Sequence, residues 1–305
     1  MIALLSLPIP HRCQNSRQAD EKVLGLRSDS TPFSEGEKPL KFRKLHGAGN
    51  DFVVMPVTEA DLGKDWAETA RQVCAQHTGV GADGLVLYAP LGRQTDVLGV
   101  SCINADGSTA TMCGNALRVT AWCVAQQHSI TRMDLLMAGT SHQAQVEADQ
   151  VWVTAEVGDV QLRCVQTAID HRVLWFDAAH TGTEHVVAVT RNVESLDVES
   201  LGRLVRRHPK LAPVGANVNF VERIGAQALK IRTYERGVEA ETLSCGSGAV
   251  AAVVIARRRG ILPGGNETVS VHNRSATPLL VRTDARENTY WVGGPVTPTF
   301  EGVLA

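Results

Sequence analysis

Apolar and polar residues alternate along most of this chain in short runs, a pattern that predicts β-strands. The first run, 41–57, breaks at Gly47-Ala48-Gly49-Asn50 and is interpreted as strand, turn and strand. The remaining predicted strands lie at 85–88, 97–103, 133–137, 143–147, 151–157, 173–177, 185–190, 217–222, 229–234, 269–271, 279–282 and 290–293.

Four other segments repeat apolar residues at the spacing of one helix face. These predicted helices cover 65–77, 113–127, 195–207 and 245–258. Two of these helices begin with similar residues. Each starts with a Cys-Gly-polar triplet, the first at Cys113 and the second 132 residues later at Cys245. The repeat indicates a weak internal duplication. We therefore expect an α+β protein of two similar lobes, with both cysteines facing the cleft between them.

Composition and charge narrow the function classes. Apolar residues make up 44% of the 305 residues, enough for a full core, and no apolar run approaches the ~18 residues of a membrane-spanning helix. The formal net charge of −2 gives no electrostatic case for binding nucleic acid or an anionic membrane. Residues 1–40 lack a basic start and are too acidic for a transit peptide, so we interpret them as a flexible extension.

The seven cysteines are odd in number, irregularly spaced and without a C-x-x-C pair, which is typical of a cytoplasmic protein with reduced thiols. Cys113 and Cys245 differ from the others because a helix N-terminus favours the thiolate form. Two such thiols are suited to serve as base and acid in cofactor-free inversion of a carbon centre. The glycine after each cysteine leaves backbone N–H groups open to a carboxylate, and Asn115 or Ser247 adds a donor. The alternative is that each cysteine is a buried structural residue beside a helix cap. For one such site alone we would favour this alternative over catalysis. For two matching sites we favour catalysis.

Other motifs give weaker signals. Residues 79–84 match G-x-G-x-x-G, but a predicted helix precedes them and a strand follows, the reverse of a dinucleotide site. His180 and His185 lack the spacing of a zinc helix, so we expect no metal and no cofactor. The pair Glu235-Arg236 is suited to clamp an ammonium and a carboxylate, or it is a surface ion pair, and the sequence leaves both open.

Taken together, these segments resemble the diaminopimelate epimerase family over residues 41–305. The motifs that carry the resemblance are His46-Gly47-Ala48-Gly49-Asn50-Asp51-Phe52, residues 78–84, Asn104-Ala105-Asp106-Gly107-Ser108, Cys113-Gly114-Asn115, Tyr234-Glu235-Arg236-Gly237, Glu241-Thr242, Cys245-Gly246-Ser247-Gly248 and Gly294-Pro295.

The resemblance implies a β-sheet wrapped around a central helix in each lobe. It implies an N-terminal lobe over 41–157, to which 287–305 returns, and a C-terminal lobe over 158–286. It assigns Cys113 and Cys245 as the acid–base pair. The implied substrate-binding residues are Asn50, Asn104, Asn115, Asn217, Glu235 and Arg236, with the N–H groups of Gly114, Asn115, Gly246 and Ser247 on the α-carboxylate. It also implies that His185 and Glu235 help to set the protonation of the thiols.

Some positions depart from the family. Where the family usually has Gly-Asn-Pro-His, this chain has Gly182-Thr183-Glu184-His185, and Thr183 is shorter than the asparagine that holds the distal end of the substrate. Ala116-Leu117 replace Gly-Ala after the first cysteine, and Gly84 stands where some members have Gln. These changes leave the chemistry intact and bear on specificity.

The expected activity is cofactor-independent interconversion of LL- and meso-2,6-diaminopimelate, a step toward lysine and cell-wall precursors. The expected partner is a small amino-acid substrate, and a homodimer is expected. The alternatives are a racemase of another amino acid on the same scaffold, a non-catalytic amino-acid-binding protein and a thiol-redox protein.

Overall fold

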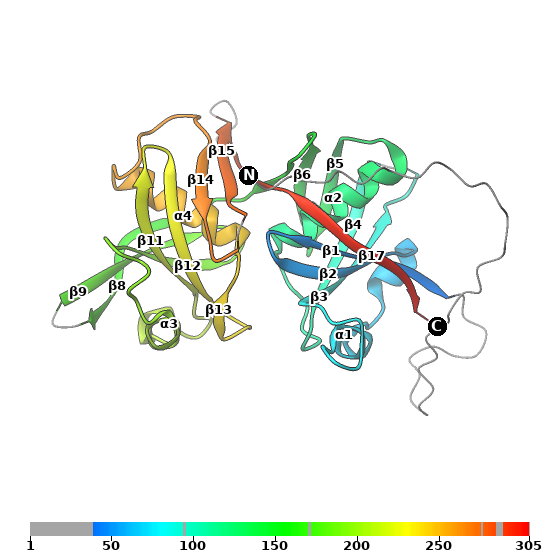
Figure 1. The fold of residues 1–305 in the computed structure, drawn as a ribbon, viewed down its shortest axis with the longest axis horizontal. Helices are drawn as coiled ribbons and strands as arrows, with labels where there is room; N and C mark the ends of the chain where they lie inside the picture. The colour runs from blue at the N-terminus through cyan, green and yellow to red at the C-terminus, as the bar shows by residue number, and fades with distance from the viewer. Residues whose placement is uncertain (1–38, 94–95, 170–171, 276, 285–288, 305) are drawn as a thin grey trace, which may run out of the picture.

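The computed structural model describes residues 39–93, 96–169, 172–275, 277–284 and 289–304. The predicted extension, 1–40, lies outside the described residues except for its last two positions. Figure 1 shows two similar halves side by side, each with a curved sheet lying against one long helix. The α+β class and the two similar halves predicted from the sequence are confirmed.

The first half is built mainly from the N-terminal part of the chain. Its strands are β1 (Leu40–Gly47), β2 (Asn50–Pro56), β3 (Gly84–Pro90), β4 (Val97–Asn104), β5 (Arg132–Met137), β6 (Thr140–Val146), β7 (Val151–Ala155) and β17 (Val296–Leu304). Its helices are the 3-10 turn η1 (Glu59–Gly63), α1 (Ala67–Cys74) and the long α2 (Gly114–His128).

The second half repeats this plan. Its strands are β8 (Val160–Ile169), β9 (Arg172–His180), β10 (Glu184–Val189), β11 (Asn217–Gly225), β12 (Ala228–Glu235), β13 (Ala240–Thr242), β14 (Val269–His272), β15 (Leu279–Asp284) and β16 (Thr289–Gly294). Its helices are α3 (Val198–Arg206), the 3-10 turn η2 (Pro209–Leu211) and the long α4 (Gly246–Arg258).

Two strand pairings tie the halves together. β16 pairs with β15 on one side and antiparallel with β7 on the other, where Gly293 lies opposite Trp152. β17 then crosses to the first half and pairs antiparallel with β1, from Gly47 opposite Val296 to Leu40 opposite Leu304. The C-terminal strand therefore completes the sheet that the first described strand begins.

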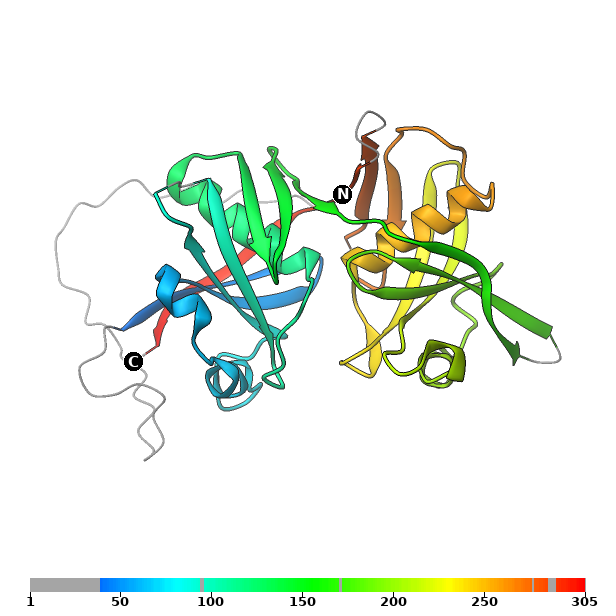
Figure 2. The same ribbon diagram turned by 180° about the vertical axis from the view of Figure 1, so that it is seen from behind.

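The long helices are buried because most of their residues are apolar, and in α2 the polar Asn115, Arg118 and Thr120 are buried with them. In α4 each residue from Gly246 to Ala256 is buried, and α2 is buried over most of its first ten residues. Figure 2 shows both helices from behind, each crossing its own sheet. Side chains of α2 and α4 belong to one core cluster, so the cysteines at their N-termini are held by a shared, densely packed framework.

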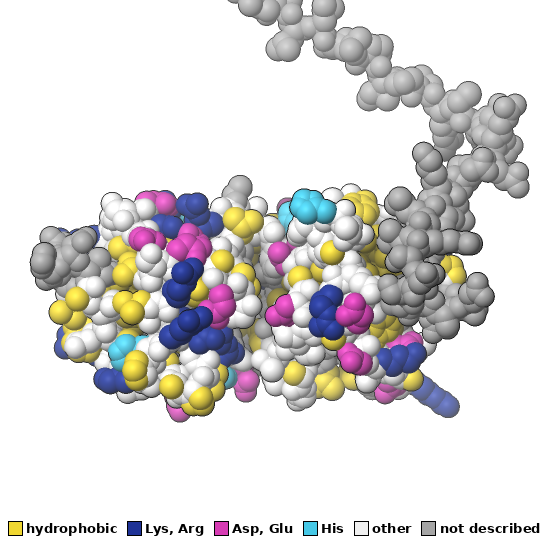
Figure 3. Space-filling model, turned by 90° about the horizontal axis from the view of Figure 1, so that it is seen from below, with side chains coloured by type: hydrophobic (Ala, Val, Ile, Leu, Met, Phe, Trp, Pro, Cys, Tyr) yellow, Lys and Arg dark blue, Asp and Glu magenta, His cyan; other side chains and the backbone are white. Residues whose placement is uncertain are grey.

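None of the helices in the part of the chain that the structure describes is long and apolar enough to cross a membrane. Acidic and basic side chains are interspersed on the face that Figure 3 shows, in keeping with the small net charge of the chain.

Candidate functional site

The two cysteines occupy the same place in their helices. Each is the residue before the first helical position and has an extended backbone, with φ −146° and ψ 99° at Cys113 and φ −129° and ψ 113° at Cys245. Each carbonyl accepts the first helical hydrogen bond, at 3.0 Å from the N–H of Leu117 and of Ala249 respectively. The Cys113 sulfur also accepts a hydrogen bond from the first turn of its helix: the N–H of Ala116 donates to Cys113 Sγ at 3.4 Å.

The two helix starts meet where the halves join. A Cβ atom at Gly246 would lie 3.9 Å from the Cα of Gly114 and 3.9 Å from Oδ1 of Asn115. Cys113 is half-buried and Cys245 is only 8% exposed. The negative charge of Glu235 opposes ionisation of both thiols, so this carboxyl group lies close enough to act on each. The structure therefore brings the two predicted cysteine segments into one site.

A chain of hydrogen bonds runs from α2 to the turn between β1 and β2. Arg118 Nη2 donates to Asn115 Oδ1 at 2.7 Å, and Asn115 Nδ2 donates to Asn50 Oδ1 at 2.9 Å. Asn50 Nδ2 then donates to Asp83 Oδ2 at 2.7 Å. Because each amide is held at both ends, the orientations of Asn50 and Asn115 at the site are fixed.

Asn104 lies at the end of β4, beside this chain. Its side-chain Nδ2 donates to Ser108 Oγ at 2.9 Å within the following turn, and its own side chain is exposed. The N–H of the next residue, Ala105, donates to the backbone carbonyl of Asp83 at 3.1 Å. Asn104 is thus next to the hydrogen-bonded residues Asn50, Asn115 and Asp83, but its side chain forms no hydrogen bond with any of these three.

His185 lies on the Cys245 side and is fully buried. Its Nε2 is 2.9 Å from Ser247 Oγ, which is 3.5 Å from Cys245 Sγ. Asn219 Nδ2 lies 3.1 Å from Nδ1 and Asn217 Nδ2 lies 3.4 Å from Nε2, so amide groups face both ring nitrogens. Burial, with the charge of Arg236 adding to it, lowers the pKa of His185 to about 3, so the ring is neutral at neutral pH.

Glu235 is the last residue of β12 and Arg236 follows it. Thr242 Oγ1 donates to Glu235 Oε2 at 2.9 Å, and burial raises the pKa of Glu235. The N–H of Arg236 donates to Asn217 Oδ1 at 2.8 Å, and Arg236 Nη2 donates to Thr183 Oγ1 at 2.9 Å. Both residues are partly buried and are bonded to these partners.

The electrostatics of the two thiols differ. A hydrogen bond from the Cys102 thiol, together with the N–H of Ala116, lowers the pKa of Cys113 in spite of its burial. Burial and the negative charge of Glu235 raise the pKa of Cys245 well above its ordinary value. Cys113 is therefore the more readily ionised of the two thiols, and Cys245 the one that more readily keeps its proton, as a proton-in, proton-out reaction requires.

Several polar residues of the site are not among those that the sequence pattern singles out as functional. Arg118, Asn219 and Thr181 are fully buried, and Thr181 Oγ1 donates to the carbonyl of Ser247 at 3.0 Å. Cys102 is 1% exposed. Asn219 could have been found from the sequence, because Asn217 and Asn219 lie on the same face at the start of β11, where the residues between and after them are apolar.

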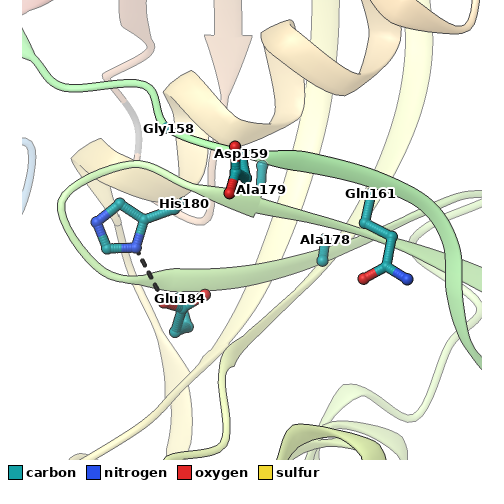
Figure 4. Close-up of a pocket in the computed structure, with 7 residues that line it drawn as sticks. All are labelled: Gly158, Asp159, Gln161, Ala178, Ala179, His180 and Glu184. Carbon is teal, nitrogen blue, oxygen red and sulfur yellow. Dashed lines mark hydrogen bonds and ion pairs between the residues drawn. The ribbon is translucent and has the colours of Figure 1, made fainter.

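A surface pocket on the second half lies apart from these residues. Figure 4 shows its lining, in which His180 Nδ1 is 3.0 Å from Glu184 Oε1. The lining residues are Gly158, Asp159, Gln161, Ala178, Ala179, His180 and Glu184. Within the described ranges, no group of three or more His, Cys, Asp and Glu side chains is arranged to hold a metal ion. The described cysteines are all free thiols.

Comparison with known proteins connects this geometry to one family. The family model described as "Diaminopimelate epimerase" matches residues 42–163 and 178–296. The diaminopimelate epimerase of Aquifex aeolicus is 33% identical over 283 residues, covering 87% of this chain and 98% of the relative. That of Methanothrix thermoacetophila is 34% identical over 280 residues, covering 87% of this chain and 96% of the relative.

Solved structures share the fold at low sequence identity. A hydroxyproline epimerase from Agrobacterium vitis, solved with trans-4-hydroxy-L-proline, superposes with a TM-score of 0.65 at 14% identity, covering 88% of this chain and 91% of that one. A PhzF-family phenazine biosynthesis protein from Bacillus anthracis superposes with a TM-score of 0.64 at 10% identity, covering 88% and 100%. The same fold thus occurs in proteins named for different reactions.

Proposed function

The chain belongs to the diaminopimelate epimerase family, and we propose that it interconverts LL- and meso-2,6-diaminopimelate with Cys113 and Cys245 as a two-base pair. The observation that carries the proposal is the meeting of two cysteine-capped helix starts between the halves. Two thiols suffice as base and acid, so the reaction needs no cofactor.

In this mechanism the thiolate of one cysteine removes the α-proton from one face of the substrate. The thiol of the other delivers a proton to the opposite face, which inverts the centre. After one turnover the first sulfur is a thiol and the second a thiolate. The lowered pKa of Cys113 and the raised pKa of Cys245 support Cys113 as the thiol that ionises first in the free protein.

The carbanion formed between these steps needs stabilisation that comes from fixed dipoles. We assign this task to the N–H groups of Gly114, Asn115, Gly246 and Ser247, which bind the α-carboxylate. The first N–H groups of a helix have no acceptor within it, and two facing helix N-termini place positive potential on both sides of the carboxylate. The close approach of Gly114 and Gly246 supports this assignment.

The second amino-acid group of diaminopimelate is assigned to Asn50, Asn104, Asn217, Glu235 and Arg236. Asn217 accepts from the backbone N–H of Arg236, and the Arg236 guanidinium donates to Thr183 Oγ1 and to the carbonyl of Gly215, which supports a fixed guanidinium for the distal carboxylate. His185 acts on Cys245 through Ser247, and Glu235 acts on both thiols. These two groups set the protonation of the pair without taking part in proton transfer.

A racemase of another amino acid on the same scaffold is the second candidate. It is favoured by Thr183, whose hydroxyl is bonded to Arg236 where the family usually has a longer carboxamide. The exchange of α-hydrogen for deuterium in D₂O separates the two candidates. We expect exchange with LL- and meso-diaminopimelate and not with alanine, glutamate or proline. Faster exchange of a monoamino acid would favour the racemase, and no exchange with any substrate would favour a binding protein.

A homodimer and a cytoplasmic location belong to the same proposal. Light scattering of the purified full chain at micromolar concentration tests the first, with a mass of twice the 32.8 kDa chain expected. A monomeric mass would contradict it.

A further inference from the structure

One guanidinium of the molecule is buried without a counter-charge. Arg118 has 0% of its surface exposed, and its Nε and Nη1 atoms have no hydrogen-bond partner among the described residues. Only Nη2 is bonded, to the Oδ1 of Asn115. Burying an unpaired charge is costly, so a folded protein that keeps one uses it.

The guanidinium lies where the two halves of the chain meet. A Cβ atom at Gly47 would be 3.0 Å from Nη2, and one at Gly294 would be 3.5 Å from it. A Cβ atom at Gly246 would be 3.8 Å from Nη1. The guanidinium therefore lies against glycines of β1, of the end of β16 and of the start of α4, and only at Gly47 would a Cβ atom crowd it.

The second helix has no such group. Val250 lies five residues after Cys245, as Arg118 lies five residues after Cys113, and it too is fully buried. The two helix starts match in backbone geometry and in capping residue, so the arginine is the largest change of charge between them.

We propose that Arg118 is a positioning residue whose buried positive charge keeps Cys113 in the thiolate form and makes the two thiols of the site unequal. The inference rests on the proposed two-cysteine function and extends it to a residue to which that proposal gives no role. Arg118 does not touch the reacting carbon in this account; it acts on Cys113 through its charge and on the substrate side through Asn115.

The charges around both groups agree with this role. The negative charge of a Cys113 thiolate raises the pKa of Arg118, which burial alone lowers, and the resulting value of about 10 leaves the guanidinium charged at neutral pH. The other titratable groups that act on Cys113 are Cys102 from β4, Glu235 from β12 and Cys245 from α4. Glu235 opposes the thiolate, so the arginine and the Cys102 thiol have to outweigh it.

The test measures how fast iodoacetamide alkylates Cys113 as a function of pH, by peptide mass spectrometry on the full chain without substrate. Arg118→Met and Arg118→Gln remove the charge, and Arg118→Lys keeps it. Arg257→Met is the matched control, because Arg257 is a half-buried arginine on the other helix, bonded to Thr283 and the carbonyl of Glu267 and remote from both thiols.

We expect the two neutral variants to raise the pH midpoint of alkylation by about one unit, equivalent to a tenfold slower reaction below the midpoint. We expect Arg118→Lys and Arg257→Met to keep the wild-type midpoint. A neutral variant that unfolds at the wild-type temperature and alkylates with the wild-type midpoint overturns the proposal. If neither neutral variant folds, Arg118→Lys decides: an unchanged midpoint supports the charge, and a shift of about one unit contradicts it.

The readout is independent of the substrate. If the wild-type protein does not exchange the α-hydrogen of diaminopimelate, the proposed function is refuted. The alkylation midpoints still test the role of Arg118. Where activity is present, the neutral variants are expected to lose kcat with little change in KM, since Arg118 does not contact the substrate.

Discussion

The starts of α2 and α4 have the same backbone plan and opposite electrostatics. Cys113 lies among groups that favour its thiolate: the Cys102 thiol, the N–H of Ala116 and the charge of Arg118. Cys245 is more deeply buried and is linked to a neutral histidine through Ser247. The duplication thus places two cysteines in equivalent backbone positions. Residues outside the repeated Cys-Gly-polar triplet give the two thiols different electrostatic environments.

This difference suits a reaction that needs a base and an acid at once. In two identical environments the singly ionised state would place its charge on either sulfur equally, whereas unequal environments assign the charge to one of them. One lowered and one raised pKa favour the mixed state over a wide pH range. The predictions below alter one side of this comparison at a time.

The largest effect is expected from removing either thiol. Cys113→Ala and Cys245→Ala should each lower epimerisation by about 10³-fold or more, because each leaves one face of the substrate without a proton-transfer group. The control is Cys164→Ala, which removes a half-buried thiol on β8 outside the site. A Cys113 or Cys245 variant with near wild-type turnover would show that the two positions are not a pair.

His185 gives a prediction that concerns only the Cys245 side. Its folded-state pKa of about 3 lies below the ordinary 6.5, so the folded protein binds fewer protons than the unfolded chain between these values. The stability that this burial provides is present above pH 6.5 and is lost as the pH falls toward 3. His185→Gln should flatten the fall in melting temperature over this range, a change of a few kcal/mol in the free energy of unfolding.

The matched control is His128→Gln, which changes an exposed histidine at the end of α2. Melting curves from pH 7 to pH 4 compare the three proteins. If the wild type and His185→Gln lose stability in parallel, the buried ring is not neutral as described.

Cys102→Ala tests the Cys113 side. Losing the hydrogen bond from the Cys102 thiol should raise the alkylation midpoint of Cys113 by up to about one pH unit and lower kcat/KM at neutral pH by up to about tenfold. Cys123→Ala is the control, since Cys123 is equally buried in the same core cluster and interacts with Arg43 instead. Equal midpoints in the two variants would leave Arg118 as the source of the asymmetry.

The smallest effect is expected at Thr183. Thr183→Asn should lower KM for diaminopimelate a few-fold and leave kcat nearly unchanged, because a carboxamide reaches the distal end of the substrate while the thiols are untouched. Thr190→Asn at the end of β10 serves as the control for a general threonine change. A higher KM in Thr183→Asn, with improved turnover of a monoamino acid, would favour the racemase.

Much of this arrangement follows from the sequence because it depends on local patterns. The four helices are set by apolar spacing and by the triplets at Cys113 and Cys245, and they appear within a few residues of their predicted ends. The site motifs lie together as expected. The strand β17 was not predicted, since most of its side chains are exposed and it is fixed by backbone pairing with β1.

What the sequence could not supply is burial. Arg118 stands in a helix among residues that suit either a surface or a core position, and only the tertiary fold encloses it with three glycines. In the sequence, Cys102 looks like any other apolar residue of a strand. Only the folded structure shows that its thiol interacts with Cys113. The groups that distinguish the two thiols are therefore the ones that no motif reveals.

The central claim is that two different thiols act on opposite faces of one α-carbon. The most direct test follows LL-diaminopimelate in D₂O at low conversion and determines the deuterium content of product and remaining substrate separately. The account predicts meso product with one deuterium at the inverted centre and remaining LL substrate without label, because the proton removed and the proton delivered belong to different sulfurs. Product that keeps the original α-hydrogen, or substrate labelled as fast as product, would mean that a single base serves both faces.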